Sequence, residues 1–272
     1  MSAVDLHTVT DYRVARERAD LVAGPGTAYV GGGTWLFSEP QPHLTRLVDL
    51  TGLEWPALTV TEDGLEIAAT CTVERIADLS DSGIWTAAPL FRQCASALLA
   101  SWKIWKRATV GGNLCLSFPA GAMISLATAL DGTVLIWSAD GTERRLPVVD
   151  FVTGIATNVL GAGDVLRSIH LPVRALQART AFRKIALSPL GRSGVVVIGR
   201  QDRDGRVTLS VTAATDRPRV LVLDRIPDRR ELDATLRERI PDAAYYTDAH
   251  GAADWRRAVT TVLAGEICEE LS

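Results

Sequence analysis

Val30-Gly31-Gly32-Gly33-Thr34-Trp35 is the stretch that decides the fold prediction, together with a second one, Ala108-Thr109-Val110-Gly111-Gly112-Asn113. The first follows an extended run at 27–29, and the second opens onto Leu114-Cys115. Because glycine has no Cβ, such turns reach positive φ and bring backbone N–H groups within hydrogen-bonding distance of anionic oxygens. Two glycine turns that clasp a diphosphate from opposite sides would hold a nucleotide, so a nucleotide cofactor is the leading hypothesis.

Neither glycine stretch matches the best-known nucleotide motifs. The Gly-Lys-Ser/Thr ending of a Walker A loop is missing after both, and neither has the G-x-G-x-x-G spacing of the dinucleotide fingerprint. We therefore exclude the P-loop and Rossmann folds. A single run of three glycines is most often an ordinary loop, so the prediction depends on finding both stretches within one domain.

The composition is that of an ordinary folded protein. The 272 residues are 47% hydrophobic and 22% charged, which is enough for one large or two modest cores. The formal net charge is −3 and no long basic stripe is present, so nucleic acid is not an expected partner. No apolar run reaches the roughly 20 residues of a membrane-spanning helix, and residues 1–5 carry no targeting-signal pattern. We expect a cytoplasmic protein without a membrane span.

No metal site and no catalytic residue is predicted. The four cysteines lie far apart, without the CxxC spacing of zinc or iron–sulfur sites, and we expect buried thiols at Cys71, Cys94, Cys115 and Cys268. The histidines have no metal-ligand spacing and are expected in surface or structural positions: His7, His43, His170 and His250. No Gly-x-Ser-x-Gly elbow indicates a hydrolase.

Hydrophobic periodicity predicts a mixed helix and sheet organisation. For the first part of the chain we expect a short helix at 11–22, a strand at 65–69, a helix capped by Thr72 that buries Val73, Ile76 and Leu79, and a helix from Pro89 whose apolar face is Phe91, Cys94, Leu98 and Trp102. A buried helix at 123–130, a strand at 133–137, a turn at Asp140-Gly141 and a strand at 165–171 follow. Beyond a boundary at 174–179 we expect three antiparallel strands at 194–198, 207–212 and 220–223, then helices at 228–240 and 254–268, the last with Trp255, Val259, Val262, Leu263 and Ile267 on one side.

The second glycine stretch continues as Thr-x-Gly-Gly-Asn-Leu-Cys, with Pro119 six residues beyond Asn113. Here the sequence resembles the FAD-binding medium subunit of molybdenum hydroxylases, the family of carbon monoxide dehydrogenase and xanthine dehydrogenase. Weaker matches occur in the expected order at 47–50, at 163–172 and at Trp255-Arg256-Arg257. The resemblance covers nearly the whole chain.

The resemblance implies an α+β fold in two domains. Residues 1–172 would form an FAD-binding domain of the PCMH type, built from two α/β subdomains at about 1–55 and 56–172. Residues 177–272 would form a C-terminal antiparallel sheet with helices, as in the carbon monoxide dehydrogenase flavoprotein.

The resemblance also implies which residues bind FAD. Backbone amides around Val30, Gly31, Gly32, Gly33, Thr34 and Trp35 would hold the diphosphate, and the second stretch would face it with Thr109, Gly111, Gly112 and Asn113. Leu166 falls where the family has an apolar residue near the isoalloxazine, and Arg183, or its neighbour Lys184, falls near a basic residue that would stabilise the reduced flavin. A core residue at Leu166 and a surface charge at Arg183 are the alternatives.

Three positions depart from the family pattern. The usual Asp of the first loop is Trp35, and further on Leu116 replaces an amide and Ala122 replaces a carboxylate that would accept from cofactor hydroxyls. The loss of one charge-assisted hydrogen bond costs roughly 1.5–3 kcal/mol, so weaker FAD binding is expected.

By the resemblance, the chain is an oxidoreductase subunit that acts within a heteromeric complex. It would bind FAD and pass electrons from iron–sulfur clusters of a small subunit, which receive them from a molybdopterin-containing large subunit, to an external acceptor. Two alternatives stay open. The chain is a structural subunit whose FAD site has decayed, or it is a flavin oxidoreductase that works on its own.

Overall fold

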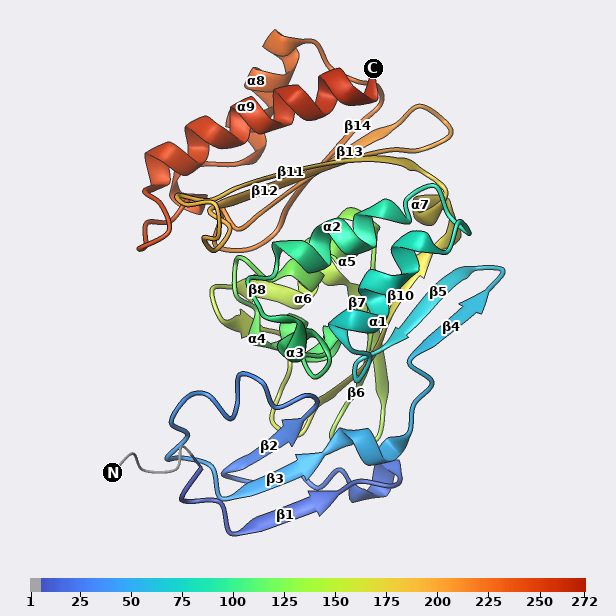
Figure 1. Cartoon of the computed structure of the whole chain (residues 1–272), viewed down its shortest axis with the longest axis vertical. Helices are drawn as coiled ribbons and strands as arrows, with labels where there is room; N and C mark the ends of the chain where they lie inside the picture. The colour runs from blue at the N-terminus through green and yellow to red at the C-terminus, as the bar shows by residue number, and fades with distance from the viewer. Residues whose placement is uncertain (1–5) are drawn as a thin grey trace.

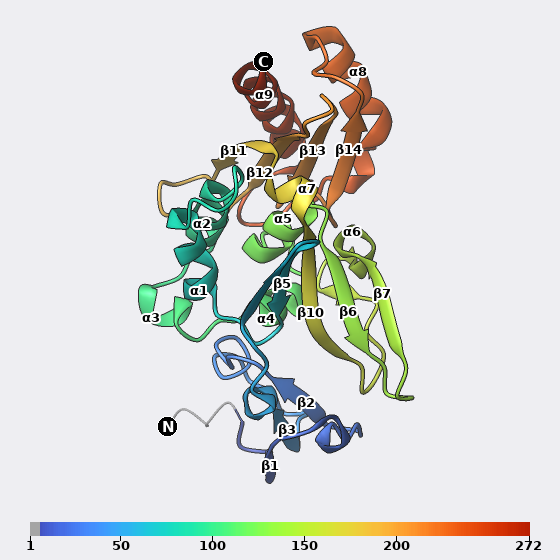
Figure 2. The same cartoon turned by 90° about the vertical axis from the view of Figure 1, so that its right-hand side faces the viewer.

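Three β-sheets are stacked along the long axis of the molecule in the computed structural model, which describes residues 6–272 (Figures 1 and 2). The chain runs from the N-terminal sheet through a middle layer of sheet and helices to a C-terminal sheet covered by two helices. Residues 1–5, for which no targeting signal was predicted, lie outside the described part. Between residues 6 and 272, no helix is both long enough and apolar enough to cross a membrane.

The N-terminal sheet is parallel, with strand order β1-β3-β2. Its elements are β1 (Asp11–Val14), the 3₁₀ helix η1 (Arg18–Asp20), β2 (Thr27–Val30), β3 (Arg46–Asp49) and the 3₁₀ helix η2 (Leu50–Leu53). The predicted helix at 11–22 is wrong, because Asp11–Val14 pairs with Arg46–Asp49 as an edge strand. Tyr12 and Val14 are 56% and 39% exposed on that strand, so burial gives it no alternating pattern.

The middle layer is a five-stranded antiparallel sheet, in the order β4-β5-β10-β6-β7, with helices on one side. Its strands are β4 (Leu58–Thr61), β5 (Gly64–Ala68), β6 (Thr133–Trp137), β7 (Glu143–Pro147) and β10 (Val165–Pro172), beside a small hairpin of β8 (Val152–Gly154) and β9 (Thr157–Asn158). Its helices are α1 (Val73–Asp78), η3 (Leu79–Asp81), α2 (Pro89–Ala97), α3 (Trp102–Trp105), α4 (Val110–Leu116), α5 (Ala122–Ala129), α6 (Val148–Phe151) and α7 (Val173–Leu176).

The C-terminal layer is a four-stranded antiparallel sheet in sequence order. It consists of β11 (Arg179–Ile185), β12 (Val195–Gln201), β13 (Val207–Thr212) and β14 (Arg219–Leu223), followed by α8 (Arg229–Arg239), η4 (Asp242–Ala244) and α9 (Ala253–Leu271). The predicted antiparallel sheet with two helices is confirmed. The strand β11 was not predicted: the boundary was placed at 174–179, and no strand was assigned to the residues that follow it up to Ile185.

Alternation along β12 joins the layers into one molecule. Val195 and Val197 lie in the core formed with α8 and α9, whereas Val196 and Ile198 lie in the core of the middle layer. Side chains alternate between the two faces of a strand, so this sheet is buried on both faces. A bond of 2.6 Å between the hydroxyls of Ser125 on α5 and Thr212 on β13 crosses the same boundary.

Most of the remaining predictions for single elements are confirmed. Thr72 caps α1, α5 is buried throughout, and Gly141 has a φ of 88° in the β6–β7 turn. Two predicted apolar faces each included a residue that does not belong to them. The helix α2 ends at Ala97, so Trp102 lies on α3, where it is 62% exposed. Val262 of α9 is 49% exposed. The division into domains at 172 and 177 stays a prediction.

The cysteines are free thiols, as predicted. Cys71, Cys94 and Cys268 are buried and Cys115 is partly buried. Burial raises the pKa of Cys71 and of Cys115 to about 12. These thiols therefore stay protonated at neutral pH and are poor nucleophiles.

Candidate functional site

The first glycine loop offers a row of backbone donors without protein acceptors. It leaves β2 at the buried Val30, and Gly33 has a φ of 69°. The N–H groups of Gly31, Gly32, Gly33, Thr34 and Trp35 find no acceptor within residues 6–272. Consecutive free N–H groups in a turn form a concave anion-binding site, so this loop can hold a phosphate or diphosphate.

The second glycine stretch is not a turn of that kind. It forms the first turn of α4, with Thr109 as the N-cap. The N–H groups of Val110 and Gly111 donate to Cys71 and Ala69 carbonyls at 2.8 and 2.9 Å. The N–H of Gly112 donates to the Thr109 hydroxyl at 3.1 Å. The expectation that both stretches supply backbone donors is therefore corrected, because the donors of the second are used within the protein.

Glycine in the second stretch serves close packing. A Cβ on Gly111 would lie 2.5 Å from the Cβ of Ala69, so the bare backbone lets α4 approach the end of β5. Asn113 accepts a hydrogen bond of 2.9 Å from the N–H of Met123 with its side-chain oxygen. Asn113 thus anchors the start of α5, and its amide nitrogen remains available to a ligand.

The two stretches nevertheless lie in contact. A Cβ on Gly32 would be 1.6 Å from the carbonyl oxygen of Arg107, and one on Gly31 would be 2.7 Å from the Thr109 hydroxyl. No side chain could be placed at Gly32 without moving the backbone. The absence of side chains therefore brings the loop of the N-terminal sheet directly against the entry to α4.

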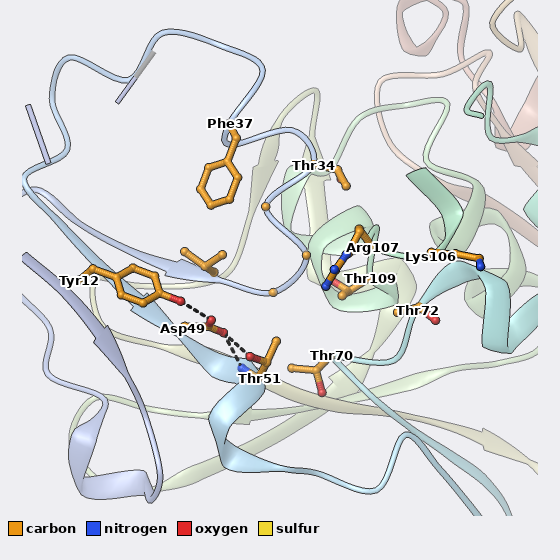
Figure 3. Close-up of a pocket in the computed structure, with 14 residues that line it drawn as sticks. Tyr12, Thr34, Phe37, Asp49, Thr51, Thr70, Thr72, Lys106, Arg107 and Thr109 are labelled. Atoms are coloured by element: carbon orange, nitrogen blue, oxygen red, sulfur yellow. Dashed lines mark hydrogen bonds between the residues drawn. The ribbon is translucent and has the colours of Figure 1, made fainter. Parts of the chain in front are cut away.

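Two cavities flank the first loop, and Val30, Gly31–Thr34 and Thr109 line both of them. We call the first the polar cavity; it has a volume of about 490 Å³ and is also lined by Tyr12, Phe37, Asp49, Thr51, Thr70, Thr72, Lys106 and Arg107 (Figure 3). We call the second the apolar cavity; it has a volume of about 590 Å³, and its further lining residues include Trp35, Leu98, Leu99, Ile104, Asn113, Leu116, Phe118 and Arg192. Both volumes are in the range of small-molecule sites.

Asp49 is the carboxylate of the polar cavity, and its hydrogen bonds fix it in place. It accepts from the Tyr12 hydroxyl at 2.5 Å and from the N–H and hydroxyl of Thr51 at 2.8 and 2.7 Å (Figure 3). Burial would raise the pKa of Asp49, but these hydrogen bonds outweigh it, so the pKa lies below its ordinary value. The hydrogen bond to Asp49 also raises the pKa of Tyr12. Asp49 is therefore ionised at neutral pH and holds β1 and β3 together.

Three of the predicted site residues line neither cavity: Leu166, Arg183 and Gly111, the last of which packs against Ala69. Leu166 on β10 is 3% exposed and belongs to the core of the middle layer, which is its alternative interpretation. Arg183 on β11 pairs with Glu266 and Glu270 of α9 at 2.9 and 2.7 Å. Its neighbour Lys184 points to the other face and lines a third cavity of about 540 Å³, which shares Ala97 with the apolar cavity. Of the two basic residues, Lys184 is the one that lines a cavity.

The three departures from the family pattern have different surroundings. Leu116 lines the apolar cavity. Trp35 is 42% exposed and packs edge-on against Phe118, with ring centroids 4.9 Å apart. Ala122 is 2% exposed within α5 and lines neither cavity. Only the first two change the surface that a ligand would meet.

Sequence reasoning missed several residues of the polar cavity, because they come from four separate segments. Tyr12, Asp49, Thr70 and Arg107 carry no motif of their own and meet only in the folded chain. The one signal available was Arg107, a basic residue two positions before Thr109. Within residues 6–272, no group of His, Cys, Asp and Glu side chains could hold a metal ion.

Comparison with known proteins identifies the family to which this geometry belongs. Residues 7–174 match the family described as the FAD binding domain in molybdopterin dehydrogenase. The chain belongs to this family, as the resemblance of its glycine stretches predicted.

Two of the relatives are named as subunits of dehydrogenases. The chain is 32% identical over 118 residues to caffeine dehydrogenase subunit beta from Pseudomonas sp. (strain CBB1), covering 42% of this chain and 40% of that protein. It is 28% identical over 172 residues to the nicotinate dehydrogenase FAD-subunit from Eubacterium barkeri, covering 58% of this chain and 55% of that protein. The chain thus matches about half the length, or less, of these curated relatives.

Solved structures share the fold over almost the whole chain. Quinoline 2-oxidoreductase from Pseudomonas putida 86 matches with a TM-score of 0.80 and 20% identity, over 96% of both chains. Carbon monoxide dehydrogenase from Oligotropha carboxidovorans matches with a TM-score of 0.80 and 22% identity, over 95% of this chain and 96% of that one. At these identities the likeness establishes the fold, and the predicted α+β class is confirmed.

Proposed function

We propose that this chain is the FAD-binding subunit of a molybdenum-containing hydroxylase or dehydrogenase. The observation that carries the proposal is the row of five free N–H groups at 31–35, placed between two cavities. A dinucleotide has this shape, with two large groups joined by a central diphosphate. The family membership and the names of the relatives support FAD as the dinucleotide.

The residues present fit FAD. The loop Gly31–Trp35 would donate hydrogen bonds to the diphosphate, and Thr34 would add its hydroxyl. The apolar cavity suits the isoalloxazine half, since Leu98, Leu116 and Phe118 exclude water from its walls. The polar cavity suits the adenosine half, where the hydroxyls of Thr70 and Thr72 can meet ribose and base. Bound FAD would supply the redox chemistry, and the chain would bind, orient and shield it.

The proposed role is electron transfer within a complex. Electrons would arrive from iron–sulfur clusters on a small subunit, after oxidation of a substrate on a molybdopterin-containing large subunit, and would leave to an external acceptor. The relatives' names, such as subunit beta and FAD-subunit, support an assembly of several chains. The free thiols support the cytoplasm as its location.

A visible absorption spectrum of the purified full-length chain, followed by denaturation and identification of the released flavin, tests the proposal. We expect flavin bands and FAD rather than FMN. A chain that neither contains flavin nor gains it on incubation with FAD would be a structural subunit with a decayed site. Turnover of a small organic donor by the isolated chain would instead indicate an oxidoreductase that works on its own.

A further inference from the structure

The first glycine loop supplies donors but no positive charge. The diphosphate of FAD carries about two negative charges, and backbone N–H groups offset them only through partial charges. A cation at the junction of the two cavities would add a charge-assisted interaction, which is about twice as strong as a neutral hydrogen bond. A cation suited to this role lines one of the cavities and has no carboxylate partner.

Arg107 meets this description. Its carbonyl is the backbone group closest to Gly32, and its side chain lines the polar cavity. Figure 3 shows its guanidinium beside the glycine loop and Thr109. Among residues 6–272 it forms no ion pair and no side-chain hydrogen bond. Asp49 is the only carboxylate among the described residues of the cavity wall, and it is already bonded to Tyr12 and Thr51.

The other cations near the loop are placed differently. Lys106 lines the same cavity, but its ammonium lies 3.6 Å from the centroid of the Trp102 ring and points away from the loop (Figure 3). Arg192 lies in the apolar cavity, 5.5 Å from the Phe118 ring centroid. Lys103 is exposed on α3 and lines none of the three cavities described above. Of these cations, Arg107 is the one whose backbone lies directly against Gly32 and whose side chain lines the polar cavity without stacking on an aromatic ring.

We infer that Arg107 binds the diphosphate of the dinucleotide, opposite the N–H groups of the glycine loop. This inference rests on the proposed function. The planar guanidinium donates two parallel hydrogen bonds to phosphate oxygens, which a lysine ammonium cannot do. Arg107 thereby selects ligands that carry a diphosphate, FAD and ADP, over riboflavin, and it makes FAD affinity depend on ionic strength.

The test is equilibrium binding of FAD and of ADP to the full-length chain freed of flavin, at low and at high salt. Three variants are compared with the original chain: Arg107→Ala, Arg107→Lys and the control Lys103→Ala, which removes the same charge from the neighbouring helix. We expect Arg107→Ala to weaken FAD and ADP alike by about tenfold or more and to flatten the salt dependence. Arg107→Lys should recover part of the affinity, and Lys103→Ala should bind like the original chain.

Two results would overturn the inference in distinguishable ways. If the original chain binds FAD and Arg107→Ala binds it equally well with the same salt dependence, Arg107 has no part in the site while the proposed function stands. If the original chain binds neither FAD nor ADP, the proposed function itself fails, and the inference with it. Thermal unfolding of each variant identifies any loss of affinity that comes from misfolding.

Discussion

At Gly32 the backbone of the N-terminal layer lies directly against the backbone of the middle layer. The carbonyl of Arg107 occupies the place where a side chain at Gly32 would be. The sequence predicted that three consecutive glycines after an extended run bring the backbone close to a ligand, but it did not predict the close approach to Arg107. It did not predict that only the first stretch keeps its N–H groups free, since that depends on acceptors at Ala69 and Cys71, about 40 residues earlier in the chain than Gly111.

Gly32→Ala should abolish most FAD binding and also destabilise the fold. A Cβ at 1.6 Å from a backbone oxygen forces the loop away from the entry to α4, and overpacking of this kind costs about 1–3 kcal/mol. FAD retention on gel filtration and urea unfolding measure the two effects. Gly24→Ala is the control, since a Cβ there meets nothing closer than 3.7 Å, and an unchanged affinity in Gly32→Ala would disprove the role of the close approach.

The elements of the fold were predictable where local pattern and tertiary burial agree. The helix α5 and the strands β5, β6, β10, β12 and β13 have continuous or alternating apolar residues, and all were predicted. The prediction failed for β1, whose partner β3 lies 35 residues further along, and for β11. In β11 the polar side chains of Arg179 and Arg183 reach the end of α9, so the strand resembles a surface linker in sequence.

The alternation of β11 leads to a prediction about the flavin. Lys184 faces the cavity beside α2, whereas Arg183 faces α9. Lys184→Met should make the reduction potential of bound FAD more negative, because a cation that stabilises the reduced anion is lost. A change of about 30 mV corresponds to 1.4 kcal/mol for two electrons.

Arg183→Met is the matched variant for that measurement. It removes the same charge from the adjacent position. It also removes the ion pairs with Glu266 and Glu270, which contribute about 0–1 kcal/mol to the free energy of unfolding. Spectroelectrochemical titration should show a shifted potential in Lys184→Met only. Equal shifts in both variants would mean that the general field of the sheet, and not the side facing the cavity, sets the potential.

Arg200 connects the C-terminal sheet with the middle layer, in addition to the apolar contacts of β12. This side chain is 2% exposed and donates to Asp202 at 2.8 Å, to the carbonyl of Ala129 at 2.9 Å and to Asp131 at 2.9 Å. Arg174 also bonds to Asp131. The network connects β12 of the C-terminal sheet with the end of α5 in the middle layer.

Arg200→Met should lower the free energy of unfolding at pH 7 by about 3 kcal/mol, because it leaves two carboxylates and a carbonyl without their buried partner. Arg206→Met, which breaks the half-exposed pair of Arg206 with Asp204 on the same hairpin, should cost less than about 1 kcal/mol. Urea unfolding measures both. Similar losses in the two variants would contradict a special role for the buried arginine.

The same network makes stability depend on acid. Burial would raise the pKa of Asp131, but the bonds from Arg200 and Arg174 outweigh it and lower the pKa below 3.8. As the pH falls through about 4, the unfolded chain takes up a proton that the folded chain does not, so the folded state loses stability. In Arg200→Met the folded pKa moves back towards 3.8, and this loss between pH 5 and 3 should become smaller in unfolding curves.

Among the described residues, the N-terminal sheet has a small core: a cluster of Val30, Leu44 and Leu47, with Ala15, Val48 and Leu50 also buried. A sheet of three short strands buries too little surface to be robust on its own, and its glycine loop meets the rest of the protein across the two cavities. A dinucleotide bound there would contact both the N-terminal sheet and the middle layer and would stabilise the contact between them. Without the dinucleotide, the N-terminal sheet would be more accessible to proteases. Riboflavin supply would then govern how long the subunit survives in the cell.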